Sequence, residues 1–321
     1  MSSKKSKVLM RKLRRPFEWL GVGLGFAVLT NVTHKGLFRL CDFISAVMYR
    51  FDRKGRRHAV ENLAAIFGDG LDPRRRERII RGSYRNMART VGHAFWTCKR
   101  ALARVKATGE MSASGRAFLA AHRPAITVSG HIGCWEILSQ LAFLEGHVMM
   151  SVAKDIGTKG MTEMLMKARM SIGQEIVPAA GAFRALMQGL KAGKSLGLLV
   201  DQAVKPSDGG VWIRFFGRPL PVSAAPAFFA AKGRAPIVTA WSRPLKDGRY
   251  RCETINFYTP AEARDIWGLT QRIAKDLEGV IRRHPSLWVL NYNAFRKTPT
   301  AEELAKLEAK EREAEAKEAA K

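Results

Sequence analysis

A histidine between two glycines, placed where a strand pattern gives way to a helix pattern, is the feature that most constrains this fold. Residues 124–129 form a short apolar and β-branched run that is typical of a buried strand. From Trp135 to Leu144, large apolar residues recur at helical spacing. The turn between the two patterns holds His131. A strand, a tight turn and a helix in this order predict one unit of an α/β protein.

Glu136 follows His131 by five residues, and this spacing suggests a pair. Within one helix the two side chains would point about 140° apart, so they can meet only if His131 precedes the helix and the chain bends back. Gly130 and Gly133 permit such a bend. A carboxylate bonded to one imidazole nitrogen makes the other nitrogen a better base. We therefore predict a His131–Glu136 dyad that deprotonates a substrate hydroxyl. A buried histidine beside a surface glutamate is the alternative from these residues alone.

Beyond this turn, strand and helix patterns alternate along the chain. Strands are predicted at 147–152, 175–178, 195–200, 236–241 and 249–257, and helices at 159–172, 182–191, 223–232 and 265–283. The expected fold class is α/β, with a mostly parallel central sheet flanked by helices and an N-terminal membrane-associated helical segment. Functional sites in such sheets collect at the carboxyl ends of strands. His131 and Asp201 both fall at such ends, although a simple capping role would also explain Asp201.

The N-terminal region combines apolar segments with basic clusters. Residues 19–32 and 36–51 are largely apolar, and basic residues flank them on both sides. The first run is shorter than the roughly 20 apolar residues of a spanning helix, and the positive charge keeps both flanks in the cytoplasm. A re-entrant or interfacial anchor fits this pattern, with two ordinary core helices as the alternative. We expect three regions: a basic N-terminus with a membrane anchor (1–57), a main domain (58–300) and a charged helical or disordered tail (301–321).

The charge distribution indicates anionic partners. The formal net charge is +27, and residues 1–106 hold 25 Lys and Arg against 7 Asp and Glu. A helix predicted from Pro73 to about Leu102 has one apolar face, which includes Val91, and one basic face. Such a field favours nucleic acid, an anionic membrane, a phosphorylated lipid or an acidic carrier protein. No nucleic-acid-binding signature accompanies the charge, so we do not expect nucleic acid as a partner.

Cysteine usage and motif content argue against bound groups. The four cysteines are far apart and form no CxxC pair, which indicates a reducing compartment and excludes a zinc ribbon. The sequence has neither a phosphate-binding glycine loop nor a Rossmann fingerprint. No metal-ligand cluster has usable spacing. We therefore expect neither a metal nor a cofactor.

Taken together, these residues resemble the bacterial lipid A biosynthesis acyltransferases, a branch of the lysophospholipid acyltransferase superfamily. The hallmark of that family is His-x4-Asp/Glu, which His131 and Glu136 match. The resemblance covers roughly residues 58–297. Further matching blocks follow in order: Arg169 with Ile172-Gly173, then Asp201-Gln202, then Phe215-Phe216-Gly217-Arg218-Pro219, then Trp288 and finally Phe295-Arg296-Lys297. The chain departs from the family at 288–295, where members usually carry a segment rich in Trp, His and Arg.

The resemblance implies an activity, its substrates and a location. It implies a membrane-associated acyltransferase that moves a fatty acyl chain from an acyl thioester to a hydroxyl of a lipid A precursor or a similar phosphorylated glycolipid. Acyl carrier protein or acyl-coenzyme A would be the donor. The anionic membrane surface would be a further partner, and the cytoplasmic face of the bacterial inner membrane the location. In this reading His131 is the general base and Glu136 orients it.

The same resemblance suggests roles for the remaining candidates. Arg169, Asp201 and Gln202 are expected to bind substrate, and Asp201 to order the site through arginine or backbone contacts. The amides of Gly133 and Cys134, near the start of a helix, are candidate donors to a tetrahedral oxyanion. Alternatives stay open: a phosphatidylinositol-mannoside-type or lysophospholipid acyltransferase, and a non-catalytic basic membrane or nucleic-acid-binding protein.

Overall fold

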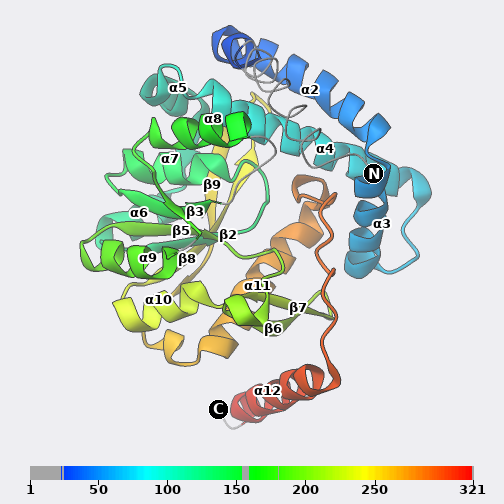
Figure 1. Ribbon diagram of the computed structural model, residues 1–321, viewed down its shortest axis with the longest axis vertical. Coiled ribbons are helices and arrows are strands. Elements are labelled where there is room, and N and C mark those ends of the chain that lie inside the picture. The colour runs from blue at the N-terminus through cyan, green and yellow to red at the C-terminus, as the bar shows by residue number, and fades with distance from the viewer. Residues whose placement is uncertain (1–22, 24, 154–158, 180, 320–321) are drawn as a thin grey trace, which may run out of the picture.

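A seven-stranded sheet forms the centre of the protein, with helices on both of its faces (Figure 1). A computed structural model describes residues 23, 25–153, 159–179 and 181–319. The strand order is β1 (Gly109–Met111), β9 (Tyr250–Tyr258), β8 (Ile237–Pro244), β2 (Ile126–Ser129), β5 (Ser195–Leu199), β3 (Met149–Ala153) and β4 (Glu175–Pro178). Neighbouring strands are parallel except for β8 and β9, which are antiparallel. The expected α/β class with a mostly parallel sheet is confirmed.

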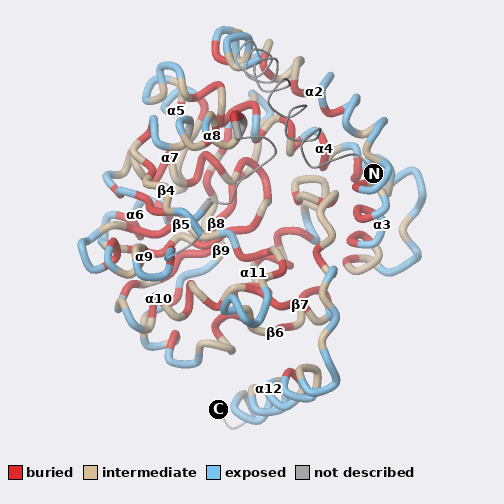
Figure 2. The backbone as a smooth tube through the Cα atoms, viewed as in Figure 1, coloured by how far each residue is buried: buried red, intermediate tan, exposed pale blue. Residues whose placement is uncertain are grey.

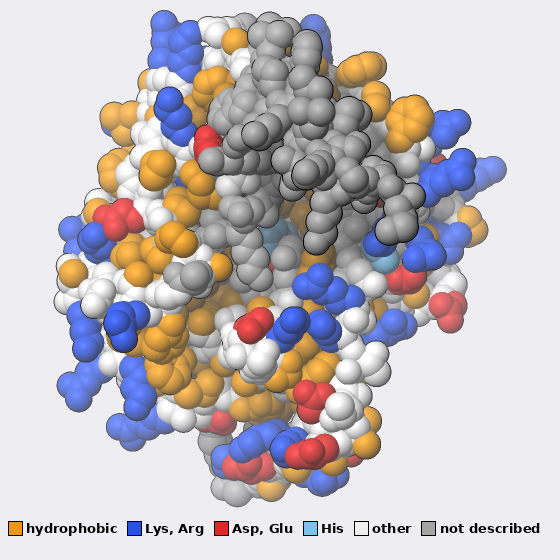
Figure 3. Space-filling model, in the orientation of Figure 1, with side chains coloured by type: hydrophobic (Ala, Val, Ile, Leu, Met, Phe, Trp, Pro, Cys, Tyr) orange, Lys and Arg blue, Asp and Glu red, His pale blue; other side chains and the backbone are white. Residues whose placement is uncertain are grey.

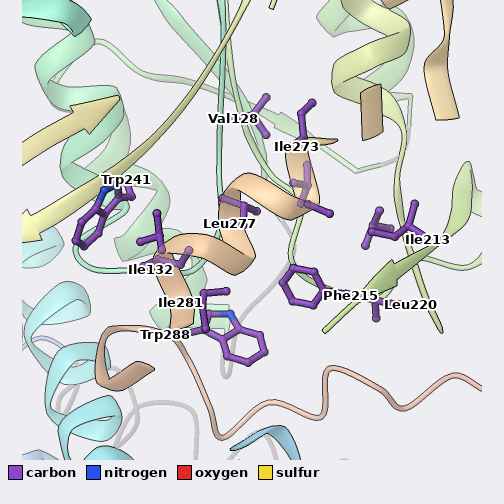
Figure 4. Close-up of a cluster of buried hydrophobic side chains, with 14 of the residues drawn as sticks. Val128, Ile132, Ile213, Phe215, Leu220, Trp241, Ile273, Leu277, Ile281 and Trp288 are labelled. Atoms are coloured by element: carbon purple, nitrogen blue, oxygen red, sulfur yellow. The ribbon is translucent and has the colours of Figure 1, made fainter. Parts of the chain in front are cut away.

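Two layers of helices bury the two faces of the sheet. One layer contains α5 (Ala101–Thr108), α6 (Ala113–Ala121) and α7 (Glu136–Leu144), and the other contains α9 (Ala182–Lys191), α10 (Ala225–Gly233) and α11 (Ile266–Arg283). In α11, Leu269, Ile273, Leu277 and Ile281 recur every four residues and are buried, as an amphipathic helix requires. Figure 4 shows part of this core, where α11 residues, Phe215 and Trp288 come together.

A hairpin that the sequence patterns did not predict packs beside α11. Its strands are β6 (Gly210–Phe215) and β7 (Arg218–Ser223), which pair antiparallel. Phe216 and Gly217 form the turn with φ of 50° and 76°, and two positive values are characteristic of a type I′ hairpin turn. The rings of Phe215 and Phe216 each lie 6.0 Å from the ring of Trp288, so the hairpin tip packs against the segment that follows α11.

The long basic helix is shorter than predicted, and its buried surface includes polar residues besides the predicted apolar ones. It is α4 (Pro73–Trp96), and Asp72 caps it by accepting from the amide of Arg75 at 2.7 Å. The helix ends before Arg100, whose left-handed φ of 53° leads into α5, so the predicted continuation to Leu102 was wrong. Of the face predicted to be apolar, Ile80, Tyr84 and Ala94 are buried, but Val91 is 36% exposed. The buried surface also includes the polar residues Ser83, Asn86 and Thr90.

The second apolar N-terminal segment forms a helix, α2 (His34–Phe51), that packs on α4. Leu37 and Cys41 are buried there, and Arg89 donates to both carboxylate oxygens of Asp42 at 2.7 Å. The predicted boundary after residue 57 falls inside α3 (Arg53–Phe67). Residues 1–22 and 24, which include most of the predicted basic N-terminus, lie outside the described part. Within that part, every helix is too short or too polar to cross a membrane.

The C-terminal tail is helical and is attached to the hairpin. Residues Ala301–Ala319 form α12, which is exposed along most of its length (Figure 2). Leu307 is only 2% exposed, and Glu311 accepts from Arg214 of β6 at 3.0 Å. Of the two predicted states, the tail therefore adopts the helix rather than disorder. Residues 320–321 lie outside the described part.

Candidate active site

His131 and Asp201 meet at the carboxyl ends of two neighbouring strands. β2 and β5 are adjacent and parallel, with Ser129 opposite Leu199, and each of the two residues lies two positions further along its strand. His131 Nδ1 is 2.7 Å from Asp201 Oδ1, and the main-chain amide of His131 donates to Oδ2 at 2.8 Å. The Asp201 side chain is 2% exposed, while that of His131 is 22% exposed. Asp201 therefore holds the Nδ1 edge of the imidazole, while part of the ring stays accessible from the surface.

The surroundings of Asp201 keep its carboxylate ionised. The indole Nε1 of Trp288 donates to Oδ2 at 2.8 Å. Burial by itself would raise the pKa of Asp201, but the charge of His131 and the hydrogen bonds from His131 and Trp288 outweigh it, so the pKa lies below its ordinary value. An ionised carboxylate only accepts hydrogen bonds, so Nδ1 of His131 carries a proton, and in the neutral ring the lone pair is then on Nε2. The side-chain amide of Gln202 lies 3.5 Å from Nε2.

Gly133 fixes the turn that carries His131. Its φ is +63°, and a Cβ there would lie 1.7 Å from the carbonyl oxygen of Ser242 in β8. The turn therefore needs glycine for its conformation and for its close approach to a neighbouring strand. The amide of Gly133 donates to the carbonyl of Leu287 at 2.9 Å, and the amide of Val289 donates to the carbonyl of His131 at 3.1 Å.

The polar face of α4 holds both this turn and the segment around Trp288. Asn86 donates to the carbonyls of Gly133 and Leu287 at 3.0 and 2.9 Å, and Thr90 donates to Gly133 at 3.0 Å. Ser83 donates to the carbonyl of Trp288 at 2.5 Å and accepts from the amide of Leu290 at 3.0 Å. These side chains satisfy buried main-chain groups that would otherwise cost stability. α4 thus sets the position of His131 relative to Trp288.

Glu136 does not contact His131 in the described part of the chain, so the predicted hydrogen bond of the dyad was wrong. Glu136 begins α7 and faces α8 (Lys159–Met170), where it accepts from Arg169 at 2.9 and 2.5 Å. The indole of Trp135 also donates to it at 3.1 Å. Burial acts to lower the pKa of Arg169, but the charge and hydrogen bonds of Glu136 raise it above its ordinary value. Arg169 is therefore neutralised by Glu136, and its role in substrate binding stays a prediction.

Gly133 and Cys134, the two residues whose amides are candidate oxyanion donors, are both buried. The amide of Gly133 is already bonded to Leu287. Cys134 is fully buried, and burial raises the pKa of its thiol well above the usual range. The amide of Gly133 is therefore not free for a substrate, while the predicted role of the Cys134 amide stays a prediction. No group of three or more His, Cys, Asp or Glu side chains in the described residues could hold a metal ion.

Sequence reasoning missed the roles of Trp288 and of the polar residues on α4. Trp288 entered only as part of a family block, with no contact attached to it. Ser83, Asn86 and Thr90 recur at three- and four-residue spacing, which places them on one helix face. A polar stripe on a helix that must also bury apolar residues is a usable signal for main-chain hydrogen bonding.

The comparison with known families agrees with the predicted resemblance. A family model described as bacterial lipid A biosynthesis acyltransferase matches residues 3–297. The match thus begins well before residue 58, where the predicted resemblance started. No curated protein matches the sequence. Among solved structures, the 1-acyl-sn-glycerophosphate acyltransferase of Thermotoga maritima aligns with 77% of this chain and 98% of its own, at 14% identity and a TM-score of 0.32.

Proposed function

Because this chain belongs to the bacterial lipid A biosynthesis acyltransferase family, it is an acyltransferase, and we propose that it acylates a hydroxyl of a phosphorylated glycolipid. The donor is an acyl thioester of acyl carrier protein or coenzyme A, and the acceptor is a lipid A precursor or a similar molecule. The observation that carries this proposal is the histidine whose Nδ1 is bonded to a buried carboxylate and whose Nε2 is left for a substrate.

The proposed reaction uses His131 as a proton shuttle. Nε2 removes the proton of the acceptor hydroxyl while the hydroxyl oxygen attacks the thioester carbonyl. The tetrahedral intermediate then collapses with loss of the thiolate, which takes the proton from Nε2 and leaves as a thiol. Asp201 keeps the ring in the required tautomer and stabilises the imidazolium as it forms.

Gln202 and the Glu136–Arg169 pair have supporting roles in this proposal. The amide of Gln202, 3.5 Å from Nε2, is close enough to donate to a substrate oxygen beside the base. Glu136 and Arg169 join the start of α7 to the end of α8, and the ring of Trp135 lies between them and His131 at 5.1 Å from the imidazole. The pair therefore positions the helix that follows the turn.

The proposed location is the cytoplasmic face of the bacterial inner membrane. The outer face of α2 carries Phe43, which is 67% exposed, and Phe51, which is 75% exposed, together with Ile44, Val47 and Met48. Arg50, Arg53 and Lys54 adjoin this apolar face. An apolar stripe flanked by cations is suited to lie at the boundary of anionic headgroups and acyl chains.

An acyl-transfer assay on the purified full chain tests the function. The protein in detergent receives an acyl thioester and a phosphorylated lipid A precursor, with a lysophospholipid as a parallel acceptor, and mass spectrometry identifies the product. We expect the glycolipid to gain one acyl chain. His131→Ala should slow this transfer about 10²–10⁴-fold. Transfer to the lysophospholipid alone would replace the proposed acceptor, and undiminished transfer by folded His131→Ala would place the base elsewhere.

A further inference from the structure

Two exposed arginines without a counter-charge lie on segments that contact the surroundings of Asp201. They are Arg218, at the tip of the β6–β7 hairpin, and Arg296, in the segment that leads to α12. No carboxylate of the described residues pairs with either of them. Several other arginines are neutralised, as the pairs Arg89–Asp42, Arg169–Glu136 and Arg214–Glu311 illustrate. Exposed arginines on α4 also lack an ion-pair partner among the described residues, but they do not contact the surroundings of Asp201 in the way that follows. The positive charge of Arg218 and Arg296 is therefore available to a ligand.

Aromatic rings hold both guanidinium groups in place. Cζ of Arg218 lies 5.7 Å from the ring centre of Phe295, and Cζ of Arg296 lies 5.1 Å from that of Tyr292. Such contacts orient a guanidinium without neutralising it and leave its N–H donors free. Phe295 is the chain neighbour of Arg296, so Arg218 of the hairpin contacts the segment that carries Arg296.

The same contacts connect the arginines to the catalytic histidine. Nη2 of Arg296 points at the carbonyl oxygen of Ala203, 3.5 Å away and two residues after Asp201. Burial raises the pKa of Tyr292, while Arg296 lowers it and Asp201 raises it further, so the Tyr292 ring lies within electrostatic reach of both. Arg218 follows the Phe216 ring, which packs on Trp288, the donor to Asp201.

Lysine and arginine side chains also gather on this part of the surface. Figure 3 shows them over the hairpin and the segment that leads to α12. Lys205 and Lys297, both close in sequence to the residues already named, add to the positive charge.

We propose that Arg218 and Arg296 form a phosphate-binding subsite that positions a substrate beside His131. The planar guanidinium fork matches phosphate oxygens, and two of them can hold one phosphate from two sides. Anchoring a phosphate fixes the rest of the substrate so that its reacting group reaches Nε2. The inference rests on the proposed function, in which both substrates offer a phosphate: the glycolipid carries one directly, and the donor carries one in its phosphopantetheine arm.

Equilibrium binding without turnover tests the subsite and distinguishes the two sources. Titration calorimetry of the full chain carrying His131→Ala uses two probe pairs. The first is a phosphorylated lipid A-type disaccharide and its dephosphorylated form. The second is S-acyl-4′-phosphopantetheine and S-acyl-pantetheine. Each pair is measured with Arg218→Gln, with Arg296→Gln and with both. Arg116→Gln is the matched control. Arg116 lies on α6 and pairs with Glu145, so this substitution removes one positive charge from another part of the surface.

The phosphorylated member of one pair should bind more tightly, and the variants should remove that preference. Each single substitution should weaken binding about tenfold, the usual size of a lost charge-assisted hydrogen bond, while Arg116→Gln leaves binding unchanged. The pair that responds identifies whether acceptor or donor supplies the phosphate. Arg218→Lys and Arg296→Lys keep the charge and should retain part of the preference, which covers any folding defect of the glutamine variants.

Two results would overturn the subsite. One is that the protein with both arginines intact binds the phosphorylated and the unphosphorylated member of each pair with equal affinity. The other is that the double variant still binds the phosphorylated member more tightly. Because binding is read without catalysis, the outcome is separate from that of the transfer assay. A protein that discriminates phosphate but transfers no acyl group keeps the subsite and loses the proposed function.

Discussion

The carboxylate of Asp201 accepts two hydrogen bonds from His131, one from the imidazole and one from the main chain. The main-chain bond fixes the turn and the ring bond fixes the rotation of the side chain, so one buried group sets both. A third donor, the Trp288 indole, leaves the carboxylate little freedom to move. Such preorganisation means that the base needs no rearrangement when a substrate arrives.

Substitution of Asp201 should be nearly as damaging to acyl transfer as loss of His131. Asp201→Asn keeps the shape but removes the charge that stabilises the imidazolium, so we expect a loss that approaches the 10²–10⁴-fold effect of His131→Ala. Because the two residues act as one unit, the double variant should be little slower than His131→Ala alone. Initial rates of the three variants, with circular dichroism as the folding control, decide this. Multiplicative losses would show that the two residues act independently.

Glu136→Gln should mainly reduce stability. The side chain of Arg169 is 19% exposed, and loss of its partner leaves a largely buried cation unpaired. Breaking such a pair costs about 3–5 kcal/mol of unfolding free energy, and Glu136→Gln with Arg169→Met should recover much of it. Urea unfolding of both variants measures the difference. A stable Glu136→Gln protein with no activity would instead restore the dyad predicted from the sequence.

Gly133→Ala should disrupt the site, whereas Gly193→Ala should not. Both glycines have positive φ, +63° and +81°, so the backbone cost of alanine is similar, about 1–2 kcal/mol. A Cβ at Gly193 meets nothing within 4 Å, but at Gly133 it lies 1.7 Å from the Ser242 carbonyl. Gly133→Ala should therefore lose more unfolding free energy and most activity. Equal melting temperatures of the two variants would contradict this account of the turn.

The buried His93 should make the protein sensitive to acid. Burial, aided by the charge of His34, lowers the pKa of His93 to about 3. The unfolded chain protonates this group near its ordinary pKa of about 6.5, so the stabilisation is complete above that pH and is lost as the pH falls toward 3. Between these values the slope is up to about 1.4 kcal/mol per pH unit. His93→Gln should flatten the measured dependence by that slope. An identical dependence in both proteins would mean that His93 is protonated in the folded state.

The exposed face of α2 should contribute to membrane binding. Phe43→Ser with Phe51→Ser removes two large apolar side chains from that face, each worth about 1.5–3 kcal/mol when buried. Co-sedimentation with phosphatidylglycerol vesicles should fall at least tenfold, and more salt should weaken the remaining binding. Val148→Ser, at another exposed apolar position, is the control. Unchanged partitioning of the double variant would assign the binding to other parts of the chain.

The sequence by itself determined which segments are helices or strands, and it placed the site at the carboxyl ends of two strands. The strand before His131, the strand before Asp201 and the helix after Gly133 follow from patterns a few residues long, and each was found close to its predicted position. Hydrophobic periodicity depends only on residues close in sequence, and it therefore predicts helices and strands without knowledge of the tertiary structure. The hairpin at 210–223 was not predicted because prolines, arginines and the Phe216-Gly217 turn interrupt the alternation of apolar and polar residues that is typical of strands.

Only the tertiary structure decided which carboxylate His131 meets. The five-residue spacing favoured Glu136, but the order of strands in the sheet brings Asp201 beside His131 from 70 positions away. In the same way, Ser83 and Trp288 bond across 205 positions. Strand order is set by hydrogen bonds and core packing between distant segments, and no local pattern encodes it. Glu136, the first residue of α7, meets Arg169 of α8 instead, a contact across 33 positions that the local spacing does not encode either.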